Sequence, residues 1–275
     1  MDSAHRVVML IYPDAQMLDI TGPLEVFART SRWLCENDCC HGPPYSLEVV
    51  AEDKAPVRCS SGIEIVATAR LDRTREADTL LVSGGIGYAR AADNPAVIDW
   101  LSTIAAATPR VASICTGALL LARAGLLDNR RATTHWAYCD ELEKAGRNIS
   151  VDPDAIYVRD GNIMTSAGVT SGIDMALAMV EADWGQPVAV AIARQLVMYL
   201  KRPGGQSQFS EHLRAQTIDS DRLQQLQLWM LDHLDDDLSV PSLARRVSMS
   251  ERSFSRRFHA AIGTSPAKYV ERCRV

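Results

Sequence analysis

One pattern constrains this chain more than any other. Through about its first 200 residues, short runs rich in Val, Ile and Leu alternate with longer stretches of helical periodicity. Continuous apolar runs are typical of strands in a mostly parallel sheet that helices cover on both faces. The pattern therefore predicts an α/β, doubly wound domain. The predicted strands are 6–12, 45–51, 79–83, 110–114, 156–159 and 162–165.

The helical stretches between these strands end at recognisable signals. Gly125, Gly146 and Gly185 each follow such a stretch, where a residue in the left-handed conformation commonly ends a helix. We expect all three glycines to adopt that conformation. The predicted helices are 22–30, 95–107, 117–124, 136–145, 171–184 and 188–200.

The pattern changes after Leu200. A segment rich in Gly, Pro and small polar residues follows, and apolar periodicity returns only near Leu223. From there the sequence predicts short helices alone, the first of them amphipathic. We therefore expect a large domain over 1–202, a linker over 203–220 and a small all-α domain over 221–275. A length of 275 residues suits this division, because most single domains have about 100–150.

Composition excludes several classes of protein. With 47% apolar residues the chain is not intrinsically disordered, and its seven cysteines form neither a disulfide framework nor a zinc-binding pattern. We interpret the local group of Cys35, Cys39, Cys40 and His41 as a surface loop and expect no metal and no cofactor. Free thiols, no signal peptide and no apolar run long enough to span a bilayer predict a soluble, cytoplasmic protein without a membrane partner.

The net charge of −5 argues against a nucleic-acid partner until it is divided along the chain. Residues 1–220 carry a net −7 and residues 221–243 a net −4, whereas residues 244–275 carry +6. A concentrated positive charge of this size suits contact with phosphate groups. The charge distribution therefore allows DNA as a partner of the C-terminal segment.

This basic segment has the layout of a helix-turn-helix. Ser239 is placed to cap a helix over 240–247, and Ser250 to cap a second helix that begins at Glu251. On the second helix, Phe254 and Phe258 share an apolar face. The opposite face could enter a major groove, and the alternative is an ordinary solvated basic face. That face carries Arg252, Ser255, Arg256 and His259.

A second feature lies in the large domain, where a buried strand gives way to a helix over 113–118. Cys115 would stand on this tight turn, beside backbone N–H groups and a helix N-terminus. Such surroundings predict a lowered thiol pKa and a reactive thiolate. The alternative is plain packing of a small buried residue.

The C-terminal segment closely resembles the first half of an AraC/XylS-type DNA-binding domain, over 243–258 and 263–272. The resemblance implies that Arg252, Ser255 and Arg256 contact bases or backbone, and that Phe254 and Phe258 are core residues. Members of that family have a second helix-turn-helix after a connecting helix. Because this chain ends within that connector, we expect a C-terminally truncated DNA-binding domain.

The large domain resembles the DJ-1/PfpI superfamily, most closely its isocyanide-hydratase-like members and the GlxA-type regulators. This implies a flavodoxin-like doubly wound, mostly parallel sheet over roughly residues 5–202. The matching motifs are 19–27, 83–85, 115–118, 131–136, 159–162 and 168–174.

The resemblance also assigns roles at the cysteine turn. Asp19 falls where the superfamily has an acidic partner of the cysteine, and Gly84 and Gly85 fall where backbone amides bind an oxyanion. Cys115 could be a nucleophile, Asp19 a proton shuttle and Thr116 a hydrogen-bonding group. Thr116 replaces the His of the protease-like branch, which argues against peptidase activity.

A ligand-binding role is equally consistent with these residues. Gly84, Gly85, Cys115 and Thr116 could form a polar cup for a small metabolite at the carboxyl ends of the strands. His135 could line that cup, or it could be an ordinary core histidine.

The combination of the two parts is that of the GlxA-type regulators. It implies a homodimeric transcription regulator that binds promoter DNA and a nitrogen-containing or amino-acid-like effector. One alternative is a cysteine-dependent hydratase or lyase resembling isocyanide hydratase, with a vestigial DNA-binding segment. Another is a redox-sensing regulator in which Cys115 is oxidised.

Overall fold

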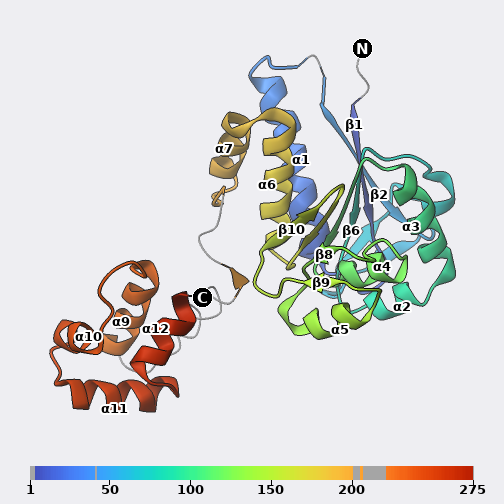
Figure 1. Ribbon diagram of the computed structural model, residues 1–275. Helices are drawn as coiled ribbons and strands as arrows, with labels where there is room; N and C mark the ends of the chain where they lie inside the picture. Colours follow the sequence, from blue (N-terminus) through green and yellow to red (C-terminus); the bar gives the residue numbers. More distant parts are fainter. Residues whose placement is uncertain (1–3, 41, 201–204, 207–220, 275) are drawn as a thin grey trace. The chain divides into compact units, whose positions relative to one another are not determined.

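The computed structural model describes residues 4–40, 42–200, 205–206 and 221–274 (Figure 1). Internal contacts divide the chain into two compact units, Met1–Pro203 and Gly204–Val275. The predicted linker over 203–220 lies outside the described residues except at 205 and 206. Among the described helices, none has the length and apolar character needed to cross a membrane.

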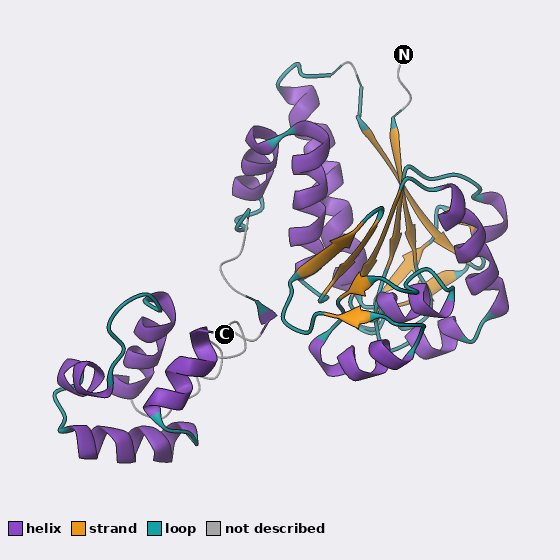
Figure 2. Cartoon of the chain, viewed as in Figure 1, coloured by secondary structure: helices purple, strands orange, loops and turns teal. Residues whose placement is uncertain are grey.

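The described part of the large unit is built on a seven-stranded sheet in the order β10-β11-β7-β6-β1-β2-β5 (Figure 2). Neighbouring strands are parallel except for β10 with β11. All predicted strands are present, which confirms the doubly wound fold. The bounds are β1 (His5–Leu10), β2 (Tyr45–Ala51), β5 (Ala69–Arg70), β6 (Thr79–Val82), β7 (Arg110–Ile114), β10 (Tyr157–Asp160) and β11 (Ile163–Ser166).

Helices cover both faces of this sheet (Figure 1). One face carries α1 (Met17–Glu36), α6 (Ser171–Trp184) and α7 (Gln186–Gln195), which pack against one another. The other face carries four more helices of the described part, which contact one another in turn. These are α2 (Tyr88–Ala92), α3 (Pro95–Ala107), α4 (Gly117–Arg123) and α5 (Cys139–Lys144), with single 3-10 turns η1 (Leu71–Arg73) and η2 (Trp136–Tyr138).

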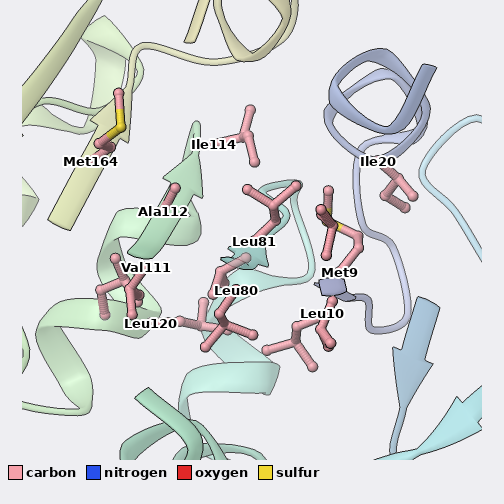
Figure 3. Close-up of a cluster of buried hydrophobic side chains, with 14 of the residues drawn as sticks. Met9, Leu10, Ile20, Leu80, Leu81, Val111, Ala112, Ile114, Leu120 and Met164 are labelled. Carbon is pink, nitrogen blue, oxygen red and sulfur yellow. The ribbon is translucent and has the colours of Figure 1, made fainter. Parts of the chain in front are cut away.

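The strands supply the centre of the core (Figure 3). Met9, Leu80, Leu81 and Ala112 are completely buried and pack with Leu120 of α4. Because both faces of these strands are covered, the runs are apolar throughout rather than alternating.

Two small pairs of strands lie outside the main sheet. β3 (Pro56–Arg58) pairs antiparallel with β4 (Glu64–Val66), and β8 (Arg131–Ala132) pairs parallel with β9 (Ser150–Val151). The sequence pattern did not predict them, because two or three residues are too few to show a period.

Three local expectations were wrong. α1 spans Met17–Glu36 rather than the predicted 22–30, with Pro23 inside the helix. α7 ends at Gln195, and Val197 beyond it has φ of 54° and is 91% exposed. Gly125 has a positive φ of 74°, as predicted, but Gly146 does not. Gly185 has a positive φ of 83°, yet its ψ of 165° places it outside the left-handed helical region that was expected. A Cβ at Gly146 would lie 2.8 Å from Ile149 Cδ1, so this glycine provides space.

The C-terminal unit has its own apolar core, formed by its described helices α9 (Asp221–Asp232), α10 (Val240–Arg246), α11 (Glu251–Ile262) and α12 (Pro266–Arg274). The rings of Phe254 and Phe258 meet edge to face at 5.3 Å, and Phe258 contacts Tyr269 at 5.5 Å. Both phenylalanines are core residues, as predicted.

The two predicted caps differ. Ser250 caps α11, because its hydroxyl accepts a hydrogen bond from the Ser253 N–H at 3.3 Å. The expectation for Ser239 was wrong, since its side chain makes no capping bond to α10. Its own N–H donates instead to Oδ1 of Asp237 at 3.0 Å, which fixes the chain just before the helix.

Candidate functional site

Cys115 occupies a strained turn between β7 and α4. Its φ is 55°, the left-handed region, which costs a residue with a side chain about 1–3 kcal/mol. Two hydrogen bonds hold this conformation. The Cys115 N–H donates to the Ser166 carbonyl at 3.0 Å, and the Thr134 hydroxyl donates to the Cys115 carbonyl at 2.8 Å. The turn therefore has the geometry of a nucleophile elbow.

Glycines allow other segments to approach this turn. A Cβ at Gly84, after β6, would lie 2.6 Å from Cys115 Cβ and 2.7 Å from Oδ2 of Asp19. A Cβ at Gly168, after β11, would lie 2.7 Å from the Cys115 sulfur. Three loops at the carboxyl ends of neighbouring strands thus meet around one side chain.

Asp19, in the first turn of α1, is fully buried beside Cys115. Its Oδ2 accepts a hydrogen bond from the Gly84 N–H at 3.1 Å, and its Oδ1 accepts one from the Val169 N–H at 3.0 Å. Burial raises the pKa of Asp19 to about 7, although the two backbone hydrogen bonds oppose the shift. Asp19 can therefore hold or release a proton near neutral pH.

The predicted thiolate is not what the turn favours. Burial, followed by the charge of Asp19, raises the pKa of Cys115 to about 12, and the Thr116 N–H and hydroxyl counteract this only in part. Cys115 is 7% exposed, so desolvation outweighs the helix N-terminus on which the prediction relied. A thiolate would form most readily with transfer of its proton to Asp19, because that transfer removes the opposing charge.

The amides of Gly84 and Gly85 are engaged within the turn. The Gly85 N–H donates to the Thr116 hydroxyl at 2.9 Å, and this hydroxyl donates to the Gly85 carbonyl at 3.0 Å. With Gly84 donating to Asp19, both amides hold side chains of the turn in place. Binding of an oxyanion by these amides stays a prediction.

His135 makes its described contacts within its own segment. Its Nδ1 accepts a hydrogen bond from the Ala137 N–H at 3.3 Å, and its ring lies 5.3 Å from that of Trp136 and 5.9 Å from that of Tyr138. Burial lowers the pKa of His135. It is the preceding Thr134, rather than His135, that bonds to the Cys115 backbone.

Sequence reasoning missed three contributors to this site. They are Thr134, Val169 and Tyr12, whose hydroxyl donates to the Ser83 carbonyl at 2.9 Å. The only sequence signal that could have found them is their position relative to the predicted strands. Tyr12 and Val169 follow apolar strand runs, and parallel strands bring such residues to the same edge of the sheet.

A cleft of about 460 Å³ lies at the carboxyl ends of β1 and β2, close to this turn. Its lining includes Tyr12, whose hydroxyl bonds to Ser83 next to the turn, and its apolar part includes buried Ile11, Ala51 and Val97. Its rim carries both signs of charge. The polar rim residues are Glu52, Asp53, Arg58, Arg90 and Asn94.

The predicted DNA-contacting residues lie together on α11. Arg252, Arg256 and His259 are exposed and Ser255 is half-buried, while Phe254 and Phe258 on the opposite face are buried. The helix-turn-helix layout is thus present in the structure, with α10 and α11 joined by a short turn.

The described residues indicate neither a metal site nor a disulfide. Within the described ranges, no three His, Cys, Asp or Glu residues are arranged to hold a metal ion. Each of the seven cysteines, all of them in described positions, is a free thiol.

Comparisons with known proteins place the chain in a family. The sequence profile of the DJ-1/PfpI family matches residues 5–182. An isonitrile hydratase of Pseudomonas putida is 31% identical over 250 residues, covering 91% of this chain and 96% of that protein. The HTH-type transcriptional regulator CdhR of Pseudomonas aeruginosa is 30% identical over 229 residues, covering 83% of this chain and 68% of the regulator.

Solved structures agree with these matches. A ThiJ/PfpI family protein from Pseudomonas syringae superposes with a TM-score of 0.64 at 25% identity, covering 89% of each chain. The resemblance that the motifs indicated is therefore confirmed. The chain belongs to the DJ-1/PfpI family, and its DJ-1/PfpI domain followed by a helical C-terminal unit fits the GlxA-type regulators of that family.

Proposed function

We propose that this chain is a cytoplasmic transcription regulator of the AraC type, whose DJ-1/PfpI domain binds a small metabolite and whose C-terminal unit binds promoter DNA. The observation that carries this proposal is the exposed basic face of α11, on a helix-turn-helix unit within the same chain as a DJ-1/PfpI domain. The similarity to HTH-type regulators supports it.

The charge and the geometry of α11 favour specific DNA contact. The segment 244–275 carries a net +6, which supplies attraction to phosphate groups. Arg252 and Arg256 lie one helical turn apart on the exposed face, where guanidinium groups can make bidentate contacts to guanine. Each such contact contributes about 1–3 kcal/mol of discrimination between bases.

Enrichment of random duplex DNA by the purified chain tests this function. We expect a preferred sequence to emerge. Arg256→Ala should weaken binding to it by roughly 5- to 150-fold and relax the preference at one base position. Arg257→Ala is the matched control, because Arg257 is an exposed arginine on the same helix that lies off the proposed face. Binding without any sequence preference, by this chain and by one extended through a second helix-turn-helix, would rule out the regulator.

For the effector, we propose an amino-acid-like or other nitrogen-containing metabolite. The cleft beside the Cys115 turn combines an apolar floor with carboxylates and guanidinium groups, an arrangement suited to a small molecule that carries both charges. We assign its binding to this cleft together with Gly84, Gly85, Cys115, Thr116 and His135. Two copies of the chain acting as a homodimer would then present two recognition helices to DNA.

Thermal unfolding across a panel of amino acids and related amines tests the effector. A ligand that binds only the folded protein raises the unfolding midpoint by mass action. We expect Arg58→Ala to abolish the rise for the ligand found. Arg147→Ala, at an exposed position outside the cleft, should leave it unchanged. Absence of any shift across the panel would count against the sensing role.

The second candidate function is hydration of an isonitrile. Two observations favour it: Cys115, Asp19 and Thr116 form one connected site, and the similarity to an isonitrile hydratase extends over 96% of that protein. In this reaction the Cys115 sulfur would add to the terminal carbon while a proton from Asp19 is delivered to it. Water would then replace sulfur and yield an N-substituted formamide.

Assay of a simple isonitrile separates the two functions. Turnover by the purified chain that disappears in Cys115→Ala would establish the enzyme. Turnover that is absent, or unchanged in Cys115→Ala, would leave Cys115 as a residue of the binding pocket.

A further inference from the structure

The end of α1 folds back on itself and brings two cysteines together. Cys35 lies in the last turn of the helix, and Asp38 after it has a left-handed φ of 54°. The Cys39 N–H returns to the Leu34 carbonyl at 2.9 Å, so the chain reverses direction. This reversal places Cys40 over Cys35.

The two sulfur atoms, Sγ of Cys35 and Sγ of Cys40, are 3.3 Å apart. A disulfide bond is about 2.05 Å long, so closing the pair requires a movement of little more than an ångström. Cys35 is exposed and Cys40 is half-buried, so reagents can reach the pair from solvent. The neighbouring Cys39 points elsewhere, with its Sγ 3.4 Å from the Asn37 carbonyl oxygen.

We propose that Cys35 and Cys40 form a redox-modification site, which reacts with hydroperoxides and closes to an intramolecular disulfide. The sulfur of one thiolate attacks the peroxide, an S–O bond forms as the O–O bond breaks, and an alcohol, or water where the oxidant is hydrogen peroxide, leaves with a proton. The second thiol then attacks the sulfenic acid, an S–S bond forms, and the S–O bond breaks with loss of water. The two thiols lose two electrons and two protons, and the peroxide is reduced.

The three buried cysteines are poorer candidates for this reaction. Cys59, Cys115 and Cys273 are buried, and Cys115 in addition holds its proton strongly, with its pKa raised by burial and by Asp19. Oxidation follows exposure and thiolate content. The pKa of Cys35 is raised as well, chiefly by its hydrogen bond with Cys40, so exposure is what distinguishes the pair from Cys115. The structure thus favours the Cys35–Cys40 pair over Cys115 as the place where oxidant acts first. This inference is independent of the function proposed for the Cys115 turn.

The pair is connected to the rest of the large unit through α1. This helix carries Cys35 in its last turn and Asp19 in its first turn, and it packs against α6 and α7. A disulfide would tie the last turn of α1 to the segment that leads into β2.

Differential alkylation of the whole chain tests the proposal. The protein is treated with a small excess of hydrogen peroxide, free thiols are blocked with iodoacetamide, and thiols released by a reductant are labelled with N-ethylmaleimide. Trypsin leaves all three cysteines on one peptide, residues 33–54, so fragment ions and variants must separate them. We expect the maleimide on Cys35 and Cys40 before any modification of Cys115.

Matched serine variants identify the partners. In Cys35→Ser and in Cys40→Ser the peptide should lose the disulfide, seen before reduction as a deficit of two hydrogen masses, because a lone sulfenic acid cannot close to one. Cys39→Ser should keep both the disulfide and the Cys35–Cys40 label. Three outcomes would overturn the proposal: no reversible oxidation in this peptide, oxidation of Cys115 first, or loss of the label in Cys39→Ser.

Discussion

Asp19 and Cys115 meet across Gly84, and the absence of a side chain there allows their approach. The same crowding dictates their chemistry, because burial raises the pKa of both groups. Sequence reasoning identified these residues but predicted the wrong direction for the thiol pKa. The turn and the helix after it can be recognised from the local sequence. The desolvation of the Cys115 thiol depends instead on loops such as 168–169, which come from elsewhere in the chain.

Gly84→Ala should damage the turn. Its Cβ would lie within 2.8 Å of Cys115, Asp19 and the Ile114 carbonyl oxygen, so some of these groups must move. We expect a loss of about 1–3 kcal/mol in the free energy of unfolding, measured by chemical denaturation. Gly42→Ala is the control, because a Cβ there meets nothing within 4 Å. Equal stability of the two variants would show that the turn yields without strain.

The pKa of Asp19 should make stability depend on pH. Its folded-state pKa of about 7 lies above the ordinary value of 3.8, so the folded protein binds this proton more tightly than the unfolded chain does. The contribution of Asp19 to stability is therefore fully present below about pH 4 and is lost as pH rises to about 7, a change of roughly 2–4 kcal/mol. Asp19→Asn should remove this contribution. The free energy of unfolding is measured by urea denaturation at intervals between pH 5 and pH 8. If it changed with pH equally in the unaltered protein and in Asp19→Asn, the raised pKa of Asp19 would be contradicted.

At the scale of elements, a polar clamp joins strands and a helix at the amino edge of the sheet. Arg110 of β7 donates two hydrogen bonds to Asp183 of α6, at 2.9 and 2.8 Å. The Tyr45 hydroxyl of β2 donates to the same carboxylate at 2.6 Å, and Arg110 Nε donates to the Thr79 hydroxyl of β6 at 2.8 Å. This edge is opposite the Cys115 turn, so the clamp serves the fold rather than the site.

Asp183→Ala should therefore destabilise the large unit. The side chains of Arg110 and Asp183 are 16% and 23% exposed, so the variant leaves a mostly buried guanidinium without its bidentate partner. We expect a loss of about 2–3 kcal/mol, because an uncompensated buried charge is costly. Glu25→Ala, which removes the exposed pair with Arg32, should cost far less in the same denaturation experiment. Similar losses in both variants would show that the clamp contributes no more than a surface pair.

Helices and strands were predictable where they are long enough to show a regular spacing of apolar residues. α3 and α6 have the bounds that apolar spacing predicted, Pro95–Ala107 and Ser171–Trp184. The pairing of β8 with β9 was not predictable, because each strand has two residues and depends on its neighbour. The contacts that complete the site, Thr134 to Cys115 and Val169 to Asp19, likewise join loops distant in sequence. Such contacts follow from the fold and not from any local pattern.

At the scale of the whole molecule, a long acidic part and a short basic C-terminal segment share one chain. The acidic balance of residues 1–220, a net −7, is incompatible with direct attraction of that segment to DNA, whereas residues 244–275 carry +6. The net charge of −5 hides this division. If the regulator proposal holds, the electrostatic part of DNA binding must come from the C-terminal segment alone.

The salt dependence of DNA binding should report that division. Each phosphate contact contributes about −0.9 to the slope of log K against log[salt], so a segment of net +6 should give a slope no steeper than about −5 to −7. Lys268→Ala should reduce the slope by about 1 if Lys268 contacts phosphate, and should weaken binding to all sequences alike. Lys144→Ala, in the acidic large unit, is the control and should leave the slope unchanged. Fluorescence anisotropy of labelled DNA at four or five salt concentrations measures this slope. A much steeper slope, or one that Lys144→Ala reduces, would mean that the large unit also contacts the DNA.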